Sequence, residues 1–210
     1  MCSMKCRLID ILISPTPKPI GPNGVATGIY KKSIDRRIMI KKLGLEGDIQ
    51  VDKRVHGGLE KAIYQYPFEN YKKLKEYFPQ LSDNFNTPSV GENFSTVGLS
   101  ENDVHIGDTF VLGETLLQVS QPRMPCWKLN HKIGNAYVSS VLINESITGW
   151  YYRVISEGSI NTNDELILQE RQAGSISITD LWKIWKDPLT RKDIEKMNIP
   201  GLSNEWYSIS

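Results

Sequence analysis

Short apolar segments alternate with turn residues along most of this chain, and this pattern restricts the fold more than any other feature of the sequence. Residues 109–112 and 115–121 flank Gly113-Glu114, a two-residue loop that begins with glycine, as a type II′ hairpin turn requires. Many short strands with few long helices are typical of a barrel or a folded sheet with small helical insertions. The sequence therefore predicts a mainly β (α+β) protein with a β-barrel core. Further strands are predicted at residues 8–13, 25–30, 36–42, 62–66, 150–156 and 165–170.

Two helices are predicted between these strands. Pro67 suits the first turn of a helix, where its missing N–H would have no partner in any case. Tyr71, Leu74 and Phe78 then follow at the spacing of one helical face. A second helix is predicted over residues 135–146.

The chain changes character from about residue 174, where short helices replace the strands. Ser177 and Asp180 form a capping box before an apolar helical face, and Thr190 and Asp193 repeat the same pattern. A third short helix is predicted from residue 203. We therefore expect two domains: a β-barrel domain over residues 1–173 and a small three-helix domain over residues 174–210.

The composition excludes several classes of protein. With 25 Lys and Arg against 24 Asp and Glu, the net charge is +1, so no basic surface for nucleic acid or for a membrane is indicated. No apolar segment approaches the roughly 20 residues of a membrane span, and the N-terminal segment is a poor signal peptide because Asp10 interrupts it. The odd number of cysteines favours a reducing compartment, the cytoplasm. Cys2 and Cys6 have no second pair of ligands to complete a metal site, so we interpret both as incidental.

Cys126 stands in the most unusual segment, QPRMPCWKL at residues 121–129. Pro122 and Pro125 remove backbone donors and fix φ, so the segment can neither extend the preceding strand nor lie inside a helix. Arg123 and Lys128 place positive charge near the thiol, which favours the thiolate. A lone cysteine is more often inert packing, but the prolines and cations together indicate a reactive or metal-bound sulfur.

Further polar clusters contain glycine, which allows a ligand to approach the backbone, and consecutive N–H groups in such turns can bind an anion. Each cluster alone is more often an ordinary turn. The clusters are GLEGD at residues 44–48, RVHGGLEKA at 54–62 and VGENF at 90–94. The cations that would suit a phosphate are Arg54, Lys61, Arg123 and Lys128.

Taken in order, these segments resemble the MOSC domain, named after the C-terminal part of molybdenum cofactor sulfurase. Within that family they are most similar to the bacterial YiiM group, which protects against N-hydroxylated purines. The resemblance covers nearly the whole chain. It rests on GLEGD (44–48), KRVHGG (53–58), AIYQYP (62–67), VGEN (90–93), VSQPRMPC (119–126) and GWYYRV (149–154).

The resemblance implies a barrel-like MOSC core that binds one pterin-based molybdenum cofactor of the molybdopterin type, followed by a three-helix C-terminal domain. It implies that Cys126 is the catalytic residue and the protein ligand to molybdenum, which agrees with the preference of a soft thiolate for such a metal. We expect the His-Gly-Gly turn and the cations near a phosphate or the pterin, and Glu92 and Asn93 near pterin nitrogens or substrate. The candidate cofactor-binding residues are His56, Gly57, Gly58, Lys61, Glu92, Asn93, Arg123 and Lys128.

The activity that the resemblance implies is that of a molybdenum-dependent oxidoreductase. It would remove the oxygen of N-hydroxylated compounds, such as hydroxylaminopurines, hydroxylamines or amidoximes, and release the amine. The chain has no Gly-x-Gly-x-x-Gly dinucleotide motif and no run of iron–sulfur cysteines. We therefore expect electrons to come from a separate flavin-containing reductase. The sequence leaves open whether the chain forms a homodimer.

Two alternative functions remain open at this point. The chain could be a cofactor carrier or sulfur-transfer module, in which Cys126 binds molybdopterin or carries persulfide without turnover. It could also be a cysteine hydrolase with His56 or His131 as the base, although no orienting partner is recognisable. His131, like His105, is otherwise interpreted as an ordinary histidine.

Overall fold

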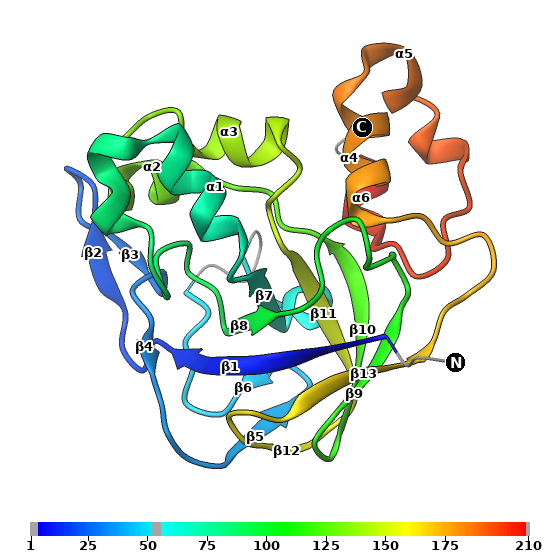
Figure 1. Ribbon diagram of the computed structural model, residues 1–210, viewed down its shortest axis with the longest axis horizontal. Coiled ribbons are helices and arrows are strands. Elements are labelled where there is room, and N and C mark those ends of the chain that lie inside the picture. The colour runs from blue at the N-terminus through cyan, green and yellow to red at the C-terminus, as the bar shows by residue number, and fades with distance from the viewer. Residues whose placement is uncertain (1–3, 52–55, 209–210) are drawn as a thin grey trace.

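The computed structural model describes residues 4–51 and 56–208 of the chain. Within these residues seven strands close into a barrel, in the order β13–β9–β10–β11–β7–β8–β1, and β1 pairs back to β13 (Figure 1). Neighbouring strands are antiparallel except β7 and β8, which are parallel. The mainly β barrel predicted from the sequence is confirmed. Its strands are β1 (Lys5–Ile13), β7 (Ile63–Pro67), β8 (Phe94–Val97), β9 (Thr109–Leu112), β10 (Thr115–Pro122), β11 (Trp150–Ser156) and β13 (Glu165–Glu170).

The predicted strands agree best with the structure where turn chemistry defines both ends. Gly113 has a φ of 53°, the left-handed value that the predicted hairpin between β9 and β10 requires at this position. The strand predicted at residues 25–30 is too long, since β3 ends at Thr27, whose hydroxyl accepts the Ile29 N–H at 3.2 Å and turns the chain. Outside the barrel ring, the short strands are β2 (Lys18–Ile20), β3 (Val25–Thr27), β4 (Lys32–Ser33), β5 (Ile38–Lys41), β6 (Gly44–Leu45) and β12 (Gly158–Ile160).

Three α-helices and a 3₁₀ segment cover one side of the barrel around a second hydrophobic cluster. The helix predicted to begin at Pro67 begins later, at Asn70, because the chain remains extended beside β8: Pro67 pairs with Thr96, and the Phe68 N–H donates to the Thr96 carbonyl at 2.8 Å. The second predicted helix is shorter than expected and ends near Asn144. These elements are α1 (Asn70–Tyr77), η2 (Pro79–Asn84), α2 (Trp127–Ile133) and α3 (Val138–Asn144); a 3₁₀ turn η1 (Leu59–Lys61) precedes β7.

The C-terminal helices begin as the first capping box predicts but not as the second one does. The Asp180 N–H donates to the Ser177 hydroxyl at 3.0 Å, which caps α4 (Ile178–Lys186). The second predicted capping box is wrong. Asp187 caps α5 (Pro188–Arg191) instead, and the Thr190 hydroxyl donates to the carbonyl of Ile184. A 3₁₀ turn η3 (Ile194–Lys196) and the predicted last helix, α6 (Asn204–Ser208), complete the chain.

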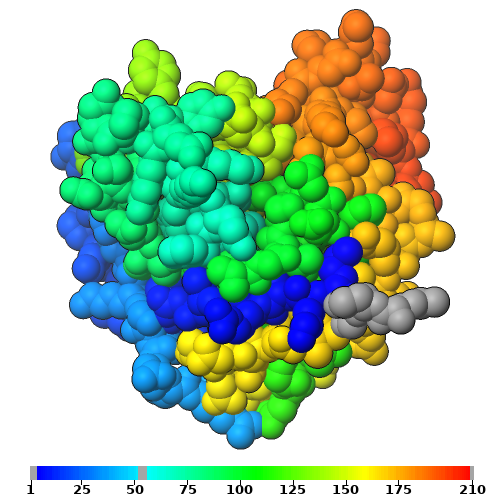
Figure 2. Space-filling model, viewed as in Figure 1, coloured from blue at the N-terminus to red at the C-terminus, as the bar shows by residue number. Residues whose placement is uncertain are grey.

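The C-terminal helices pack on the barrel through a shared core. Trp182 and Trp206 are fully buried with their rings 5.2 Å apart, and the Trp182 indole donates to the Thr148 hydroxyl at 2.9 Å. Figure 2 shows that the C-terminal helices and the α1–α3 group project separately from the same side of the molecule, at the top of the view. The division at residue 173 stays a prediction. In the part of the chain that the structure describes, no helix has the length and apolar character needed to cross a membrane.

Candidate functional site

Cys126 lies at the corner between β10 and α2, as the prolines around it predict. Its φ of −130° and ψ of 171° are extended, and its carbonyl accepts the Leu129 N–H at 3.0 Å, so Cys126 is the residue at which the helix begins. Its side chain is partly exposed, and Cys126 forms no disulfide. The corner therefore presents a free thiol at a fixed position.

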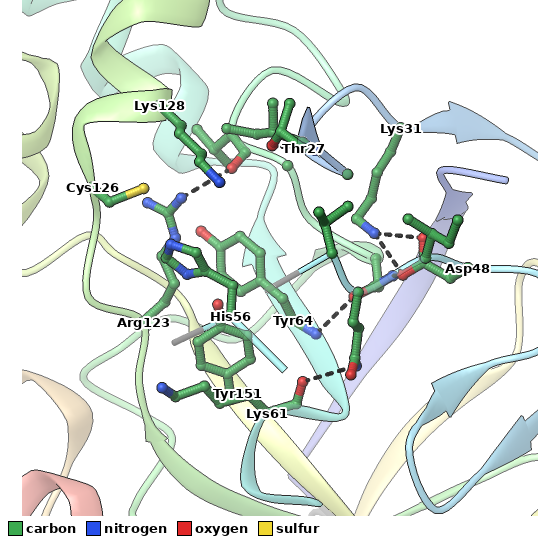
Figure 3. Close-up of a pocket in the computed structure, with 18 residues that line it drawn as sticks. Thr27, Lys31, Asp48, His56, Lys61, Tyr64, Arg123, Cys126, Lys128 and Tyr151 are labelled. Atoms are coloured by element: carbon green, nitrogen blue, oxygen red, sulfur yellow. Dashed lines mark hydrogen bonds and ion pairs between the residues drawn. The ribbon is translucent and has the colours of Figure 1, made fainter. Parts of the chain in front are cut away.

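The Cys126 side chain belongs to the walls of two adjoining cavities. The inner cavity, drawn in Figure 3, measures about 670 Å³ when the adjoining space open to solvent is included, and lies between β7, β11 and the segments around Lys31 and Asp48. The outer cavity adjoins it and is bounded by the Cys126 corner, Val25 and α6. The residues common to both walls are His56, Lys61, Cys126, Lys128 and Tyr151.

The inner cavity is strongly cationic. Four candidate residues from the sequence, His56, Lys61, Arg123 and Lys128, line it together with Cys126. Lys31, which the sequence did not single out, adds another cation. Among the described lining residues the single carboxylate is Asp48, and the Lys31 ammonium already neutralises it at 2.6 Å. A cavity of this charge suits a multiply negative ligand such as a phosphate.

Arg123 has an unused donor inside this wall. Its side chain is buried, and the guanidinium lies 5.3 Å from the centre of the Tyr64 ring. Nη2 makes one long hydrogen bond of 3.5 Å to the Val90 carbonyl, whereas the buried Nη1 has no hydrogen-bond partner among the described residues. Leaving a buried donor unpaired costs about 1–3 kcal/mol, so a ligand that accepts from Nη1 would remove this cost.

Asn93 lines the inner cavity but is held by three other segments. Its Oδ1 accepts the Tyr64 N–H at 3.1 Å, and its Nδ2 donates to the Leu12 carbonyl at 3.2 Å and to Asp48 at 2.8 Å. Burial lowers the pKa of Lys31, and the adjacent Asp48 carboxylate opposes that shift. Asn93 therefore links β1, β7 and the Lys31–Asp48 pair through hydrogen bonds, and its role in this structure is to hold these segments of the cavity wall together.

Glu92 is not among the residues that line either cavity. Its carboxylate is fully buried and accepts a hydrogen bond from the Tyr71 hydroxyl, on the side of α1. Burial raises the pKa of Glu92. The sequence-based expectation that Glu92 and Asn93 act side by side on a ligand therefore differs from this geometry, because Asn93 lines the inner cavity whereas the Glu92 carboxylate is directed toward Tyr71.

The His-Gly-Gly turn is built around Gln50. The Gly58 N–H donates to Gln50 Oε1 at 3.1 Å, and a Cβ added at Gly57 would lie 2.5 Å from the same oxygen. The two glycines thus allow Gln50, which lines the inner cavity, to approach the backbone, and neither glycine is itself among the lining residues. His56 does line both cavities, while Lys53 and Arg54 lie outside the described residues.

Tyr64 and Tyr151 are site residues that sequence reasoning missed. They face each other across β7 and β11, with ring centres 5.3 Å apart, and both line the inner cavity. Both lie in motifs that carry the family resemblance, AIYQYP and GWYYRV, but only strand pairing shows that they share one wall. His131 lies on the exposed side of α2 and His105 bridges to Ser177, and neither is among the lining residues.

Comparisons with known proteins identify the family. The sequence profile of the MOSC domain matches residues 52–167. Protein YiiM of Escherichia coli is 37% identical over 187 residues, which are 88% of this chain and 83% of that protein. A protein named "Reductase" from Gibberella moniliformis is 31% identical over 81% of this chain, but this chain spans only 33% of its length.

Solved structures agree with the sequence match. The crystal structure of YiiM from Escherichia coli gives a TM-score of 0.79 at 30% identity and covers 97% of this chain and 89% of that one. That of YiiM from Geobacillus stearothermophilus gives 0.78 at 31% identity, with 97% and 96% covered. The profile covers more than half of the chain, and both fold and sequence match YiiM across nearly all of it, so this protein belongs to the MOSC domain family and is YiiM-like.

Proposed function

We propose that this protein is a molybdenum-cofactor-dependent reductase of N-hydroxylated compounds. The observation that carries the proposal is one free thiol, Cys126, in the wall of a cationic cavity that also holds the unpaired donor of Arg123. The family is generally associated with the molybdenum cofactor. The name of the Gibberella relative supports an oxidoreductase.

The residues present fit such a cofactor. A phosphate-bearing pterin needs cations and hydrogen-bond donors, and the inner cavity offers Lys128, His56 and the unpaired Nη1 of Arg123, together with Lys61, whose ammonium also pairs with Glu205. A molybdenum ion prefers a soft ligand, and the Cys126 thiol lies in the same wall. We therefore assign Cys126 as the metal ligand and the cations as the groups that hold the cofactor's phosphate.

When bound, the cofactor would supply the two-electron chemistry that, with two protons, converts an N–OH group into N–H and water. The protein's own residues would bind the cofactor and orient it. The cations near Cys126 favour its thiolate over its thiol. Tyr64 and Tyr151 form a rigid wall, and the hydrogen bonds of Asn93 hold that wall against β1. Glu92 lies behind this wall of the cavity, where its carboxylate accepts a hydrogen bond from the Tyr71 hydroxyl.

The proposal includes a separate flavin-containing reductase as the electron donor, because the sequence has no dinucleotide or iron–sulfur motif. It also places the reaction in the cytoplasm, where the free thiols of Cys6 and Cys126 would stay reduced.

Reduced viologen dye tests the activity. Protein made in a host that supplies molybdenum cofactor should contain molybdenum and should oxidise the dye when an amidoxime or hydroxylamine is added, with release of the amine. Protein from a host without the cofactor is the control. If the loaded protein contains molybdenum but turns over none of these compounds, the alternative function, a cofactor carrier or sulfur-transfer module, would replace the proposed one.

The outer cavity favours the enzyme, since a carrier has no need of a second cavity beside the thiol.

A further inference from the structure

The outer cavity has two kinds of wall. One wall is apolar and consists of Val25, Met124, Pro125 and Trp127, which lie on either side of the Cys126 corner. The opposite wall is polar and comes partly from the C-terminal segment, through Glu205. The two walls meet at Cys126, which also faces the inner cavity, so a ligand in the outer cavity would lie beside the thiol.

Trp127 is a large aromatic side chain that remains half exposed at this position. Its exposed fraction is 49%, whereas the described tryptophans Trp150, Trp182 and Trp206 are fully buried. The indole is supported rather than loose. A Cβ added at Gly21 would lie 3.0 Å from the indole, and the His131 ring packs edge-on against it at 6.3 Å. The remaining surface of a held, flat, apolar ring lies at the cavity wall.

Glu205 is the single carboxylate among the described residues that line the outer cavity, and it is already paired with a lysine. The Lys61 ammonium donates to Glu205 Oε1 at 2.6 Å, and the Ser203 hydroxyl donates to Gln121 Oε1 at 2.5 Å. Lys128, which lines both cavities, donates to the Ala26 carbonyl at 3.4 Å, whereas the unpaired donor of Arg123 belongs to the inner cavity alone. The buried donor that lacks a partner thus lies in the inner cavity, and the flat apolar wall of the outer cavity favours a ligand with an uncharged planar ring.

We propose that the outer cavity is the substrate subsite and that Trp127 is its specificity-determining residue. The planar ring of an N-hydroxylated aromatic or heteroaromatic compound stacks on the Trp127 indole, which places the N-hydroxyl group next to Cys126. The inner cavity holds the anionic part of the cofactor, so the two cavities divide binding between them. This inference rests on the proposed function, and it adds which compounds the site selects and the residue that selects them.

The test compares an aromatic with a small substrate in one assay. Molybdenum-loaded wild type and Trp127→Ala are assayed with reduced viologen on benzamidoxime and on acetamidoxime. The substitution should raise the KM for benzamidoxime about tenfold, within the range of base–aromatic stacking on alanine substitution, and change the KM for acetamidoxime less than about twofold. Molybdenum per chain should stay unchanged. Trp127→Phe should restore most of the KM for benzamidoxime, since it keeps a flat ring. Tyr137→Ala is the matched control, because Tyr137 is an exposed aromatic residue that does not line either cavity.

Equal changes for both substrates, or no change for either, would overturn the role of Trp127. A second measurement separates this failure from failure of the proposed function. If loaded wild type turns over neither compound, calorimetry on wild type and on Trp127→Ala can still measure the binding of benzamidoxime, which is uncharged at neutral pH. Binding that weakens about tenfold in the variant supports the subsite, while equal affinity, or no binding to wild type, rejects it.

Discussion

Cys6 and Cys126 belong to the same barrel, but their surroundings differ in every property that controls a thiol. Cys6 lies on β1 in the core, where burial raises its pKa from 9.0 to about 12, an effect that a weak hydrogen bond from Gln65 only partly opposes. Cys126 lies at a corner between two elements, partly exposed, in a wall lined with cations. The difference shows that position in the fold, and not residue type, decides which thiol can bind a metal.

Replacing Cys126 tests the comparison most severely. Cys126→Ala should lower molybdenum content and reductase activity more than about 100-fold, because loss of a residue that only supports a metal ligand already costs about 10–100-fold. The melting temperature should move little, since the side chain is at a solvent-accessible corner. Metal analysis, viologen oxidation and a thermal melt measure the three quantities. Full activity in Cys126→Ala would remove this residue from the site.

Removing the positive charge beside Cys126 should have the next largest effect. Arg123→Ala should lower the molybdenum content per chain about tenfold, which is the range for loss of a residue that supports a metal ligand. Its melting temperature should change little. Arg123→Lys keeps the charge but not the planar fork, so it should recover only part of the loss. Arg37→Ala, a change of an exposed arginine, is the control. Equal molybdenum in wild type and Arg123→Ala would make Arg123 a purely structural corner residue.

The core thiol should show the opposite pattern. Cys6→Ala should keep its molybdenum and activity but lower the free energy of unfolding by about 1 kcal/mol, because it leaves a small void among buried side chains. We therefore expect Cys6 to be incidental for function but not for stability. In native protein at pH 8, iodoacetamide should modify Cys126 and spare Cys6, which peptide mass analysis can measure. Rapid alkylation of Cys6 would contradict its place in the core.

The stability that Cys6 contributes should also change with pH. Because the folded pKa of Cys6 lies above its unfolded value of about 9, its stabilising contribution is complete below pH 9 and is lost as pH rises from about 9 to 12. The stability advantage of wild type over Cys6→Ala should therefore shrink as pH rises from 8 to 10.5. Urea unfolding of both proteins at each pH measures this difference, and an advantage that stays constant would refute the raised pKa.

The sequence predicts those parts of the site that depend on neighbouring residues. Two prolines and two cations were enough to place Cys126 at a corner, and Ser177 with Asp180 was enough to begin α4. The cofactor and its ligand came from the family resemblance. The place of Tyr64, Tyr151 and Lys31 in the cavity wall could not be predicted, although two of the family motifs contain the tyrosines, because strand pairing and a distant loop bring these residues together. Glu92 shows the remaining difficulty, since a residue in the right motif can still face away from the cavity.

The pairing of β1 with β13 also affects how the chain folds during synthesis. Lys5 and Ile167 are partners, so the barrel cannot close until nearly the whole chain has left the ribosome. Until then β1 keeps an unpaired edge, and such edges attract other chains. Contacts between residues so far apart in sequence also slow folding. We therefore expect a nascent chain stalled before β13 to need protection by a chaperone, and one extended past Glu170 to become resistant to protease.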